Sequence, residues 1–158
     1  MLRLMLNKHT QIAVPHESHF IIPLVKRFHP QESLTKAQLT EAGDIILNHP
    51  RFHTWHISKN DIQNIIESLP VPCSLEKLIT AVFEKKVQPA GKKYWGEKTP
   101  EYIDIIPQLK QLYPGAKFIA LCRDGRDVSA SLKERGWEGW TVYQRATYWK
   151  NCMYKMNT

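Results

Sequence analysis

The sequence predicts an α/β fold with a parallel sheet, and two segments carry that prediction. In the first, residues 118–122 form a short apolar run typical of a fully buried parallel strand, and a charged turn around Gly125 and a helix follow it. In the second, a short strand near Tyr94, a helix near Thr99 and a turn at 113–116 lead back to the same run, which completes a strand-helix-strand unit. Strands joined by a crossover helix lie parallel in one sheet.

The other elements follow from hydrophobic spacing and capping residues. Residues 2–9 have helical spacing, residues 11–14 form a short strand, and residues 15–20 form the loop after it. The stretch 33–87 is mostly helical, with starts near Ser33 or Thr35, near Ser58 or Asn60, and at Ser74. Thr99 and Pro100 suit the start of a further helix, and residues 143–156 form another.

Length and composition limit the class of protein. A chain of 158 residues without internal repeats suits a single domain over 1–158, which buries roughly two-thirds of its unfolded surface. The three cysteines, Cys73, Cys122 and Cys152, contain no CxxC pair, and Cys122 is expected to be a small buried side chain. The formal net charge of +7 favours an anionic partner: nucleic acid, an anionic membrane surface or a nucleotide.

The pattern of the chain narrows that choice. No apolar run approaches the roughly 18 residues of a membrane span, and residues 1–11 are too polar for a signal peptide, so we expect a cytoplasmic protein. The Lys and Arg residues are dispersed, without a recognition-helix pattern or an aromatic RNA-binding motif, so we expect no nucleic acid partner. The sequence leaves the oligomeric state open.

The turn and helix at 123–135 have the character of an anion site. Arg123 follows the predicted strand, while Ser131 and Arg135 lie four residues apart on one helix face. Backbone N–H groups at a helix N-terminus, the helix dipole and guanidinium groups all favour phosphate. The alternative is that Arg123 and Arg126 pair with the two aspartates of the same turn on a solvated surface, which contributes little.

Two motifs resemble those of a known family. Arg-Asp-Gly-Arg-Asp-x-x-x-Ser resembles the motif with which sulfotransferases bind the 3′-phosphate of PAPS (3′-phosphoadenosine 5′-phosphosulfate), with Arg123 and Ser131 at that family's spacing. Arg135 coincides with a further phosphate-contacting arginine of the tyrosylprotein branch. Trp-Gly-Glu-Lys-Thr-Pro-x-Tyr-Ile, at 95–103, resembles a segment of bacterial sulfotransferases. The resemblance covers essentially all of the chain.

This resemblance implies a more specific fold. It is a three-layer, P-loop NTPase-like parallel sheet in which 33–87 is a helical insertion that helps to line the acceptor cleft. In the family, a strand and a Gly-Thr-Thr loop that holds the 5′-phosphosulfate precede a helix resembling the one at the start of this chain, and further helices follow the phosphate motif. No such loop occurs in the sequence. We therefore expect the chain to be truncated at both ends.

The resemblance also implies site residues for sulfuryl transfer from PAPS to an acceptor hydroxyl or amine. Glu17 would be the catalytic base, and Lys98 would neutralise charge on the sulfuryl group and the leaving phosphate. Arg123, Ser131 and Arg135 would bind the 3′-phosphate. The residues themselves agree in part, because Glu17 lies on a loop at the C-terminal end of a predicted strand, where ligands bind in open α/β sheets. Without the resemblance, Glu17 and Lys98 have the character of ordinary solvated side chains.

Metal binding and two other functions are alternatives to sulfuryl transfer. His16 and His19 flank Glu17 without forming an HExxH motif, and His53 and His56 suit a packed surface or an acceptor pocket, so we expect no metal. One alternative is a non-catalytic fragment that binds 3′-phosphoadenosine nucleotides. The other is a P-loop kinase or NTPase relative, against which the missing Walker lysine argues.

Overall fold

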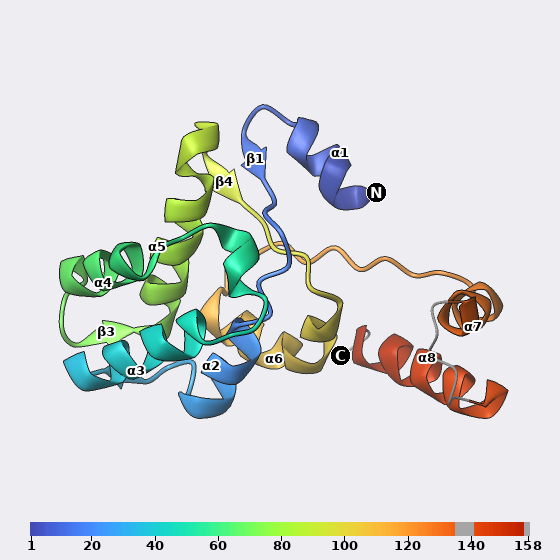
Figure 1. Cartoon of the computed structure of the whole chain (residues 1–158). Helices are drawn as coiled ribbons and strands as arrows, with labels where there is room; N and C mark the ends of the chain where they lie inside the picture. Colours follow the sequence, from blue (N-terminus) through green and yellow to red (C-terminus); the bar gives the residue numbers. More distant parts are fainter. Residues whose placement is uncertain (135–140, 157–158) are drawn as a thin grey trace. The chain divides into compact units, whose positions relative to one another are not determined.

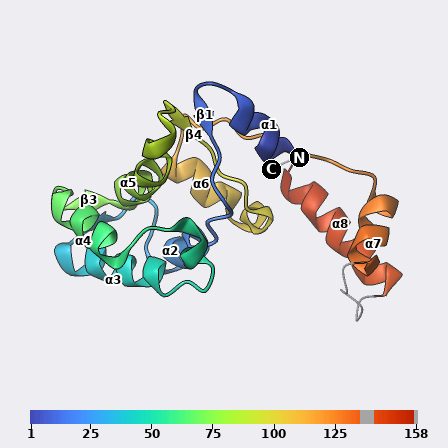
Figure 2. The same ribbon diagram turned by 45° about the horizontal axis from the view of Figure 1, so that its top comes forward.

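The computed structural model describes residues 1–134 and 141–156, and Figures 1 and 2 show it from two directions. The chain divides into two compact units, Met1–Pro114 and Gly115–Thr158. The first unit contains α1 (Leu2–Lys8), β1 (Ile12–Ala13), α2 (Ile21–Arg27), β2 (Ser33–Leu34), α3 (Lys36–Leu47), η1 (Phe52–Trp55), α4 (Lys59–Ser68), β3 (Cys73–Ser74), α5 (Leu75–Val87), η2 (Gln88–Ala90), β4 (Tyr94–Trp95), η3 (Pro100–Ile105) and α6 (Ile106–Leu112). The second contains α7 (Gly125–Glu134) and α8 (Val142–Met156). The elements labelled η are 3₁₀ helices.

A small parallel sheet joins two distant parts of the first unit. β1 pairs with β4, with Ile12 opposite Tyr94 and Ala13 opposite Trp95, and the two strands lie side by side in Figure 1. A separate antiparallel pair joins β2 to β3. The fold is therefore mixed α/β, and the strands expected at 11–14 and near Tyr94 are confirmed. The carboxyl ends of β1 and β4 lead directly into the loops that carry Glu17 and Lys98.

The helices of the 33–87 stretch begin where capping residues predict. The hydroxyl of Thr35 accepts a hydrogen bond from the backbone N–H of Gln38, and that of Ser58 accepts one from Asp61, each within a full capping box. Ser74 caps α5 by accepting from the N–H of Lys77. Each hydroxyl satisfies a backbone donor that would otherwise have no partner in the first helical turn. The helix expected at residues 2–9 is present as α1.

An aromatic cluster forms the part of the core that lies beneath the site. Phe20 contacts Trp55 edge-on, with 5.1 Å between ring centroids, and Trp55 contacts Phe83 in the same way at 4.9 Å. Phe83 stacks on Trp95 at 4.2 Å. Phe20 follows the loop that carries Glu17, and Trp95 belongs to β4, which precedes the loop that carries Lys98. The cluster therefore packs next to both loops.

The helix expected at Thr99 begins differently from the prediction. Thr99 precedes η3, but its side chain makes no cap hydrogen bond, and the α-helical part starts only at Ile106. The Thr99 hydroxyl instead donates to the Glu97 carboxylate at 2.6 Å. Pro100 occupies the first position of η3, as expected, because its missing N–H costs nothing there.

The second unit is a pair of packed helices, which Figure 1 shows in orange and red. The indole N–H of Trp149 on α8 donates to the backbone carbonyl of Arg123 at 2.9 Å. The same ring covers Gly125, where an added Cβ would lie 2.9 to 3.2 Å from three ring atoms. The helices expected after the charged turn and at 143–156 are thus confirmed, and a glycine at 125 is what allows them to approach.

The prediction of a buried strand at 118–122 is wrong. The segment is extended, but it pairs with no strand among the described residues, and Phe118, Ile119 and Leu121 are 47, 63 and 69% exposed. Cys122, expected to be buried, is also exposed, and its thiol contacts the sulfur of Met153 at 3.2 Å. The reason is physical: an apolar run can signal burial, but a strand exists only where a neighbouring strand takes its backbone hydrogen bonds.

Across residues 1–134 and 141–156, no helix combines the length and apolar character that spanning a membrane requires. The single domain over 1–158 and its insertion at 33–87 stay predictions.

Candidate functional site

The predicted site residues fall into two groups. Glu17 and Lys98 lie in the first unit, whereas Arg123 and Ser131 lie in the second. Arg135 falls outside the described residues, so its role stays a prediction. Each group is described within its own unit.

A cavity of about 370 Å³ surrounds the first group. It is lined by Arg3, His16, Glu17, His19, Arg51, Thr54 and Lys98. The lining holds one carboxylate, two guanidinium groups and one ammonium group, so with neutral histidines its formal charge is positive. Such a cavity favours a ligand that carries negative charge.

Glu17 and Lys98 meet at this cavity. The ammonium group of Lys98 donates to Glu17 Oε1, although the two residues are 81 positions apart in the sequence. Burial by itself raises the pKa of the Glu17 carboxyl, but the hydrogen bond and charge of Lys98 oppose it, and the pKa is held below its ordinary value of 4.5. At neutral pH, Glu17 is therefore ionised and able to accept a proton.

Three hydrogen bonds hold the loop that carries Glu17. The indole N–H of Trp55, whose ring is fully buried, donates to the Glu17 carbonyl at 3.3 Å. The next residue, Ser18, donates from its backbone N–H to Glu97 Oε1 at 3.2 Å and from its hydroxyl to the same oxygen at 3.1 Å. The Glu17 loop is thus attached both to the aromatic core and to the loop that carries Lys98.

Glu97 is the centre of that attachment. Its Oε1 accepts from Ser18 and from the Thr99 hydroxyl, and the Ser18 hydroxyl also hydrogen-bonds the hydroxyl of the buried Tyr102. Burial raises the pKa of the Glu97 carboxyl, which these hydrogen bonds partly offset. Since Ser18 adjoins Glu17 and Glu97 adjoins Lys98, the network sets the register in which those two side chains face each other.

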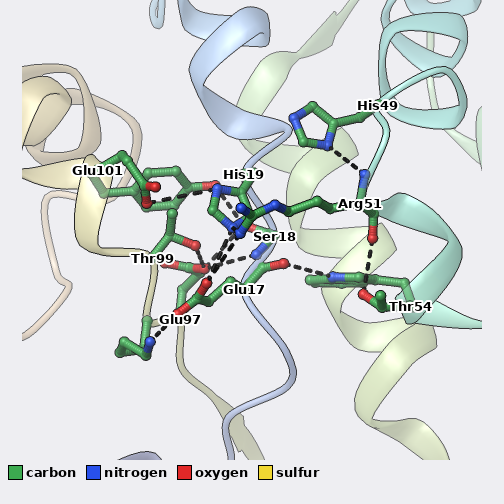
Figure 3. Close-up of polar contacts among 12 residues, drawn as sticks. Glu17, Ser18, His19, His49, Arg51, Thr54, Glu97, Thr99 and Glu101 are labelled. Atoms are coloured by element: carbon green, nitrogen blue, oxygen red, sulfur yellow. Dashed lines mark hydrogen bonds and ion pairs between the residues drawn. The ribbon is translucent and has the colours of Figure 1, made fainter. Parts of the chain in front are cut away.

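His19 and Arg51 complete the charged lining. Figure 3 shows Arg51 reaching across toward His19 and Glu17. Arg51 Nη1 lies 2.8 Å from His19 Nε2 and 3.6 Å from Glu17 Oε2. His19 is buried, has a left-handed backbone with φ 50°, and its ring stacks on His49 with 6.0 Å between centroids. A positive φ is costly for a residue with a side chain and is concentrated at functional sites.

The second group lies at the start of α7. Arg126 donates to both oxygens of Asp124, at 3.0 and 2.8 Å, and Arg123 lies 3.8 Å from Asp127. The hydrogen bonds from Arg126 lower the pKa of the Asp124 carboxyl. The intraturn pairing considered as an alternative is therefore present. It leaves the Arg123 side chain 62% exposed, and an exposed pair of this kind is readily replaced by a ligand.

Comparison with protein families decides the identity of the chain. The whole sequence, residues 1–158, matches the model described as the sulfotransferase family. The chain belongs to the sulfotransferase family. Comparison with curated proteins and with solved structures gave no match. Membership of this family makes the chain a relative of enzymes that transfer sulfuryl groups, and the family resemblance read from its two motifs is confirmed.

The histidines of this sulfotransferase-family chain are distributed unevenly. His16 and His19 line the cavity, while His53 and His56 are exposed and are not part of its lining. Within the described ranges, no three His, Cys, Asp or Glu side chains are grouped so that they could hold a metal ion. The side chains that pack in this part of the chain are not the two histidines but Phe52 and Trp55, which are buried.

Sequence reasoning about this sulfotransferase-family chain missed four residues of the site. The sequence predicts no role for Ser18, Arg51 or Glu97, and it suggests His19 only as a metal ligand, which its pattern disfavours. Ser18 adjoins Glu17, Glu97 adjoins Lys98 and His19 lies two residues after Glu17, so proximity to a predicted site residue was the available signal. Arg51 carries no such signal, because it reaches the site only through the packing of the segment after α3.

Proposed function

We propose that this chain transfers a sulfuryl group from PAPS to an acceptor hydroxyl or amine. Glu17 removes the acceptor proton, and Lys98 stabilises charge on the sulfuryl group and the leaving phosphate oxygen. Arg123, Ser131 and Arg135 bind the 3′-phosphate of the donor. The observation that supports this most directly is the contact between Glu17 and Lys98 at one cavity, because the family resemblance implies one reaction for these residues, which are 81 positions apart in the sequence.

The chemistry follows from the groups present. A bond forms between the acceptor oxygen or nitrogen and sulfur, the bond from sulfur to the phosphate oxygen breaks, and the acceptor proton goes to the Glu17 carboxylate. Negative charge grows on the departing oxygen, where a nearby ammonium group lowers the barrier. The exchange needs one base and one cation, both of which the cavity supplies.

The second group suits the donor's 3′-phosphate. The Arg123 guanidinium is exposed and makes a loose contact with Asp127, so a phosphate is able to take the place of that carboxylate. Ser131 lies on α7, eight residues after Arg123, and offers a hydroxyl donor. Binding energy gained at a phosphate that does not react serves to position the reacting group. The three-layer, P-loop-like sheet implied by the family is part of the same proposal.

The proposal is tested by following sulfur-35 from labelled PAPS to a set of small acceptors that includes a phenol, a primary alcohol and an amine. The change is Glu17→Gln, which preserves shape but removes the base. We expect label transfer to fall by roughly 10² to 10⁴, the usual contribution of a general base. Glu67→Gln, on the exposed face of α4, is the matched control and should keep the parent rate.

The outcomes separate the alternatives. If Glu17→Gln transfers label as fast as the parent chain, Glu17 is not the base. If the parent chain binds the donor nucleotide but transfers no label to any acceptor, the non-catalytic binding function replaces the catalytic one.

A further inference from the structure

His19 lies between two carboxylates, one inside the cavity and one at the surface. Its Nε2 is 3.2 Å from Glu17 Oε2, and its Nδ1 is 3.7 Å from Glu101 Oε2. The His19 side chain is only 9% exposed, whereas that of Glu101 is 54% exposed. Figure 3 shows the imidazole ring next to Glu101 and above Glu17. A buried imidazole with one nitrogen toward each carboxylate joins the candidate base to the protein surface.

The neighbouring arginine determines which nitrogen carries the proton. Arg51 Nη1 lies 2.8 Å from His19 Nε2, and a guanidinium group only donates hydrogen bonds. In its neutral form, His19 therefore accepts the Arg51 N–H at Nε2 and carries its hydrogen on Nδ1, facing Glu101. Glu17 Oε2 lies 3.2 Å from the same nitrogen, so a protonated Glu17 carboxyl is able to donate to Nε2 in place of Arg51.

The backbone holds the ring in this place at a cost. His19 has a φ of 50°, in the left-handed region that disfavours side chains. Its position is maintained by the turn into α2, where Ile22 N–H donates to the His19 carbonyl at 3.3 Å, and by stacking on His49. Backbone strain is concentrated at functional sites, and His19 is strained where it contacts Glu17, so we infer a functional role for His19.

We propose that His19 is the proton relay of this site, carrying to the surface the proton that Glu17 takes from the acceptor. The proposal rests on the sulfuryl transfer proposed above. After the new bond to sulfur has formed and the bond to phosphate has broken, Glu17 holds one proton. It passes this proton to His19 Nε2, which gives an imidazolium, and the ring releases its Nδ1 proton to Glu101 or water. Exchange with water then restores the form protonated on Nδ1, and Glu17 is ionised for the next cycle.

The charges around the ring suit this relay. Glu17 faces His19 from the loop after β1, Glu101 faces it from η3, and Arg51 and His49 face it from the segment after α3. The two carboxylates stabilise a transient imidazolium, while Arg51 disfavours a permanent one. His49 adds no charge at neutral pH, because burial and the charges of His19 and Arg51 lower its pKa.

The first test uses the chain without donor or acceptor. Nitrogen-15 NMR of the histidine rings reports which nitrogen is protonated and the pH at which each ring titrates. We expect neutral His19 to be protonated on Nδ1, and we expect Glu17→Gln to lower the pH at which His19 titrates, since it removes a facing carboxylate. A neutral ring protonated on Nε2, or a titration that Glu17→Gln leaves unchanged, would overturn the relay. This test is independent of whether the chain turns over.

The second test measures turnover. His19→Gln should lower kcat by about tenfold to a hundredfold, less than loss of the base, while KM for donor and acceptor changes little. Added buffer bases should restore the rate in proportion to their concentration and basicity, which a purely structural role does not predict. His53→Gln, at an exposed histidine outside the cavity lining, is the control and should keep the parent kcat. An unchanged kcat in His19→Gln contradicts the relay, whereas an inactive parent chain contradicts the proposed sulfuryl transfer, with the NMR test still deciding on His19.

Discussion

At the scale of single residues, the candidate site depends on how a few charged groups share a small cavity. Glu17 is contacted by the cations Lys98 and Arg51 and by the His19 ring, so its negative charge faces two positive groups. The sequence allowed Lys98 to be predicted from its motif and Glu17 from the family resemblance. It did not allow Arg51 or Glu97 to be predicted, because their role depends on which segments pack together rather than on local pattern.

The ionisation of Glu17 leads to a prediction about pH. Its pKa lies below 4.5 in the folded chain, so the base form is lost only as pH falls through that lowered value. The acid limb of kcat/KM, which reports the free enzyme, should therefore lie below pH 4.5. In Lys98→Met the same limb should move to higher pH, because burial then raises the pKa of Glu17 against less positive charge, and the rate at neutral pH should also fall.

Steady-state rates measured between about pH 3.5 and 8 test this expectation, because this range extends to both sides of the ordinary pKa of a glutamate, about 4.3. Lys85→Met, which removes a lysine paired with Asp61 on α4, is the matched control and should leave the acid limb in place. An acid limb that stays where it is in Lys98→Met would mean that Lys98 does not set the ionisation of Glu17.

At the scale of elements, helices were easier to predict than strands. Thr35, Ser58 and Ser74 each cap a helix as expected, because a cap is a local interaction within four residues. The segment 118–122 did not form the expected strand, because strand formation depends on a distant partner that a local pattern does not specify. Thr99 failed as a cap for a related reason: its hydroxyl was taken by Glu97, which the local sequence gives no reason to prefer.

The packing of α7 on α8 leads to a prediction about stability. Gly125→Ala would place a methyl group 2.9 to 3.2 Å from the Trp149 ring, so the indole must move and its hydrogen bond to Arg123 weakens. We expect the free energy of local opening of these helices to fall by about 1 to 3 kcal/mol, as for overpacked sites, which exceeds the gain in helix propensity near a helix end.

Hydrogen exchange of the α7 and α8 amides measures that opening directly. Gly115→Ala is the matched control, since nothing lies within 4 Å of the added methyl group. Equal protection in Gly125→Ala and the parent chain would show that the close approach of Trp149 to Gly125 does not limit the packing of these helices.

At the scale of the whole molecule, the sequence predicted the fold class and the family, while the arrangement of strands had to come from the structure. The family match extends over residues 1–158, and the mixed α/β architecture with parallel β1 and β4 agrees with the predicted class. The formal net charge of +7 favours an anionic ligand for the chain as a whole, and the positive lining of the cavity provides one place for it. Charge alone did not identify that ligand, whereas the resemblance of the 123–131 motif to that of sulfotransferases implies a donor with a 3′-phosphate.

The measurement that tests the central proposal most directly is calorimetric titration of the chain with 3′-phosphoadenosine 5′-phosphate and, in parallel, adenosine 5′-phosphate. We expect the 3′-phosphorylated nucleotide to bind at least about tenfold more tightly, since a charge-assisted contact contributes about 1.5 kcal/mol or more. Arg123→Ala should remove most of that preference, and Arg27→Ala, which breaks an exposed pair with Glu41, should not. Equal affinity for the two nucleotides, or no binding of either by the folded chain, would contradict the assignment of this sulfotransferase-family chain as a PAPS-dependent enzyme.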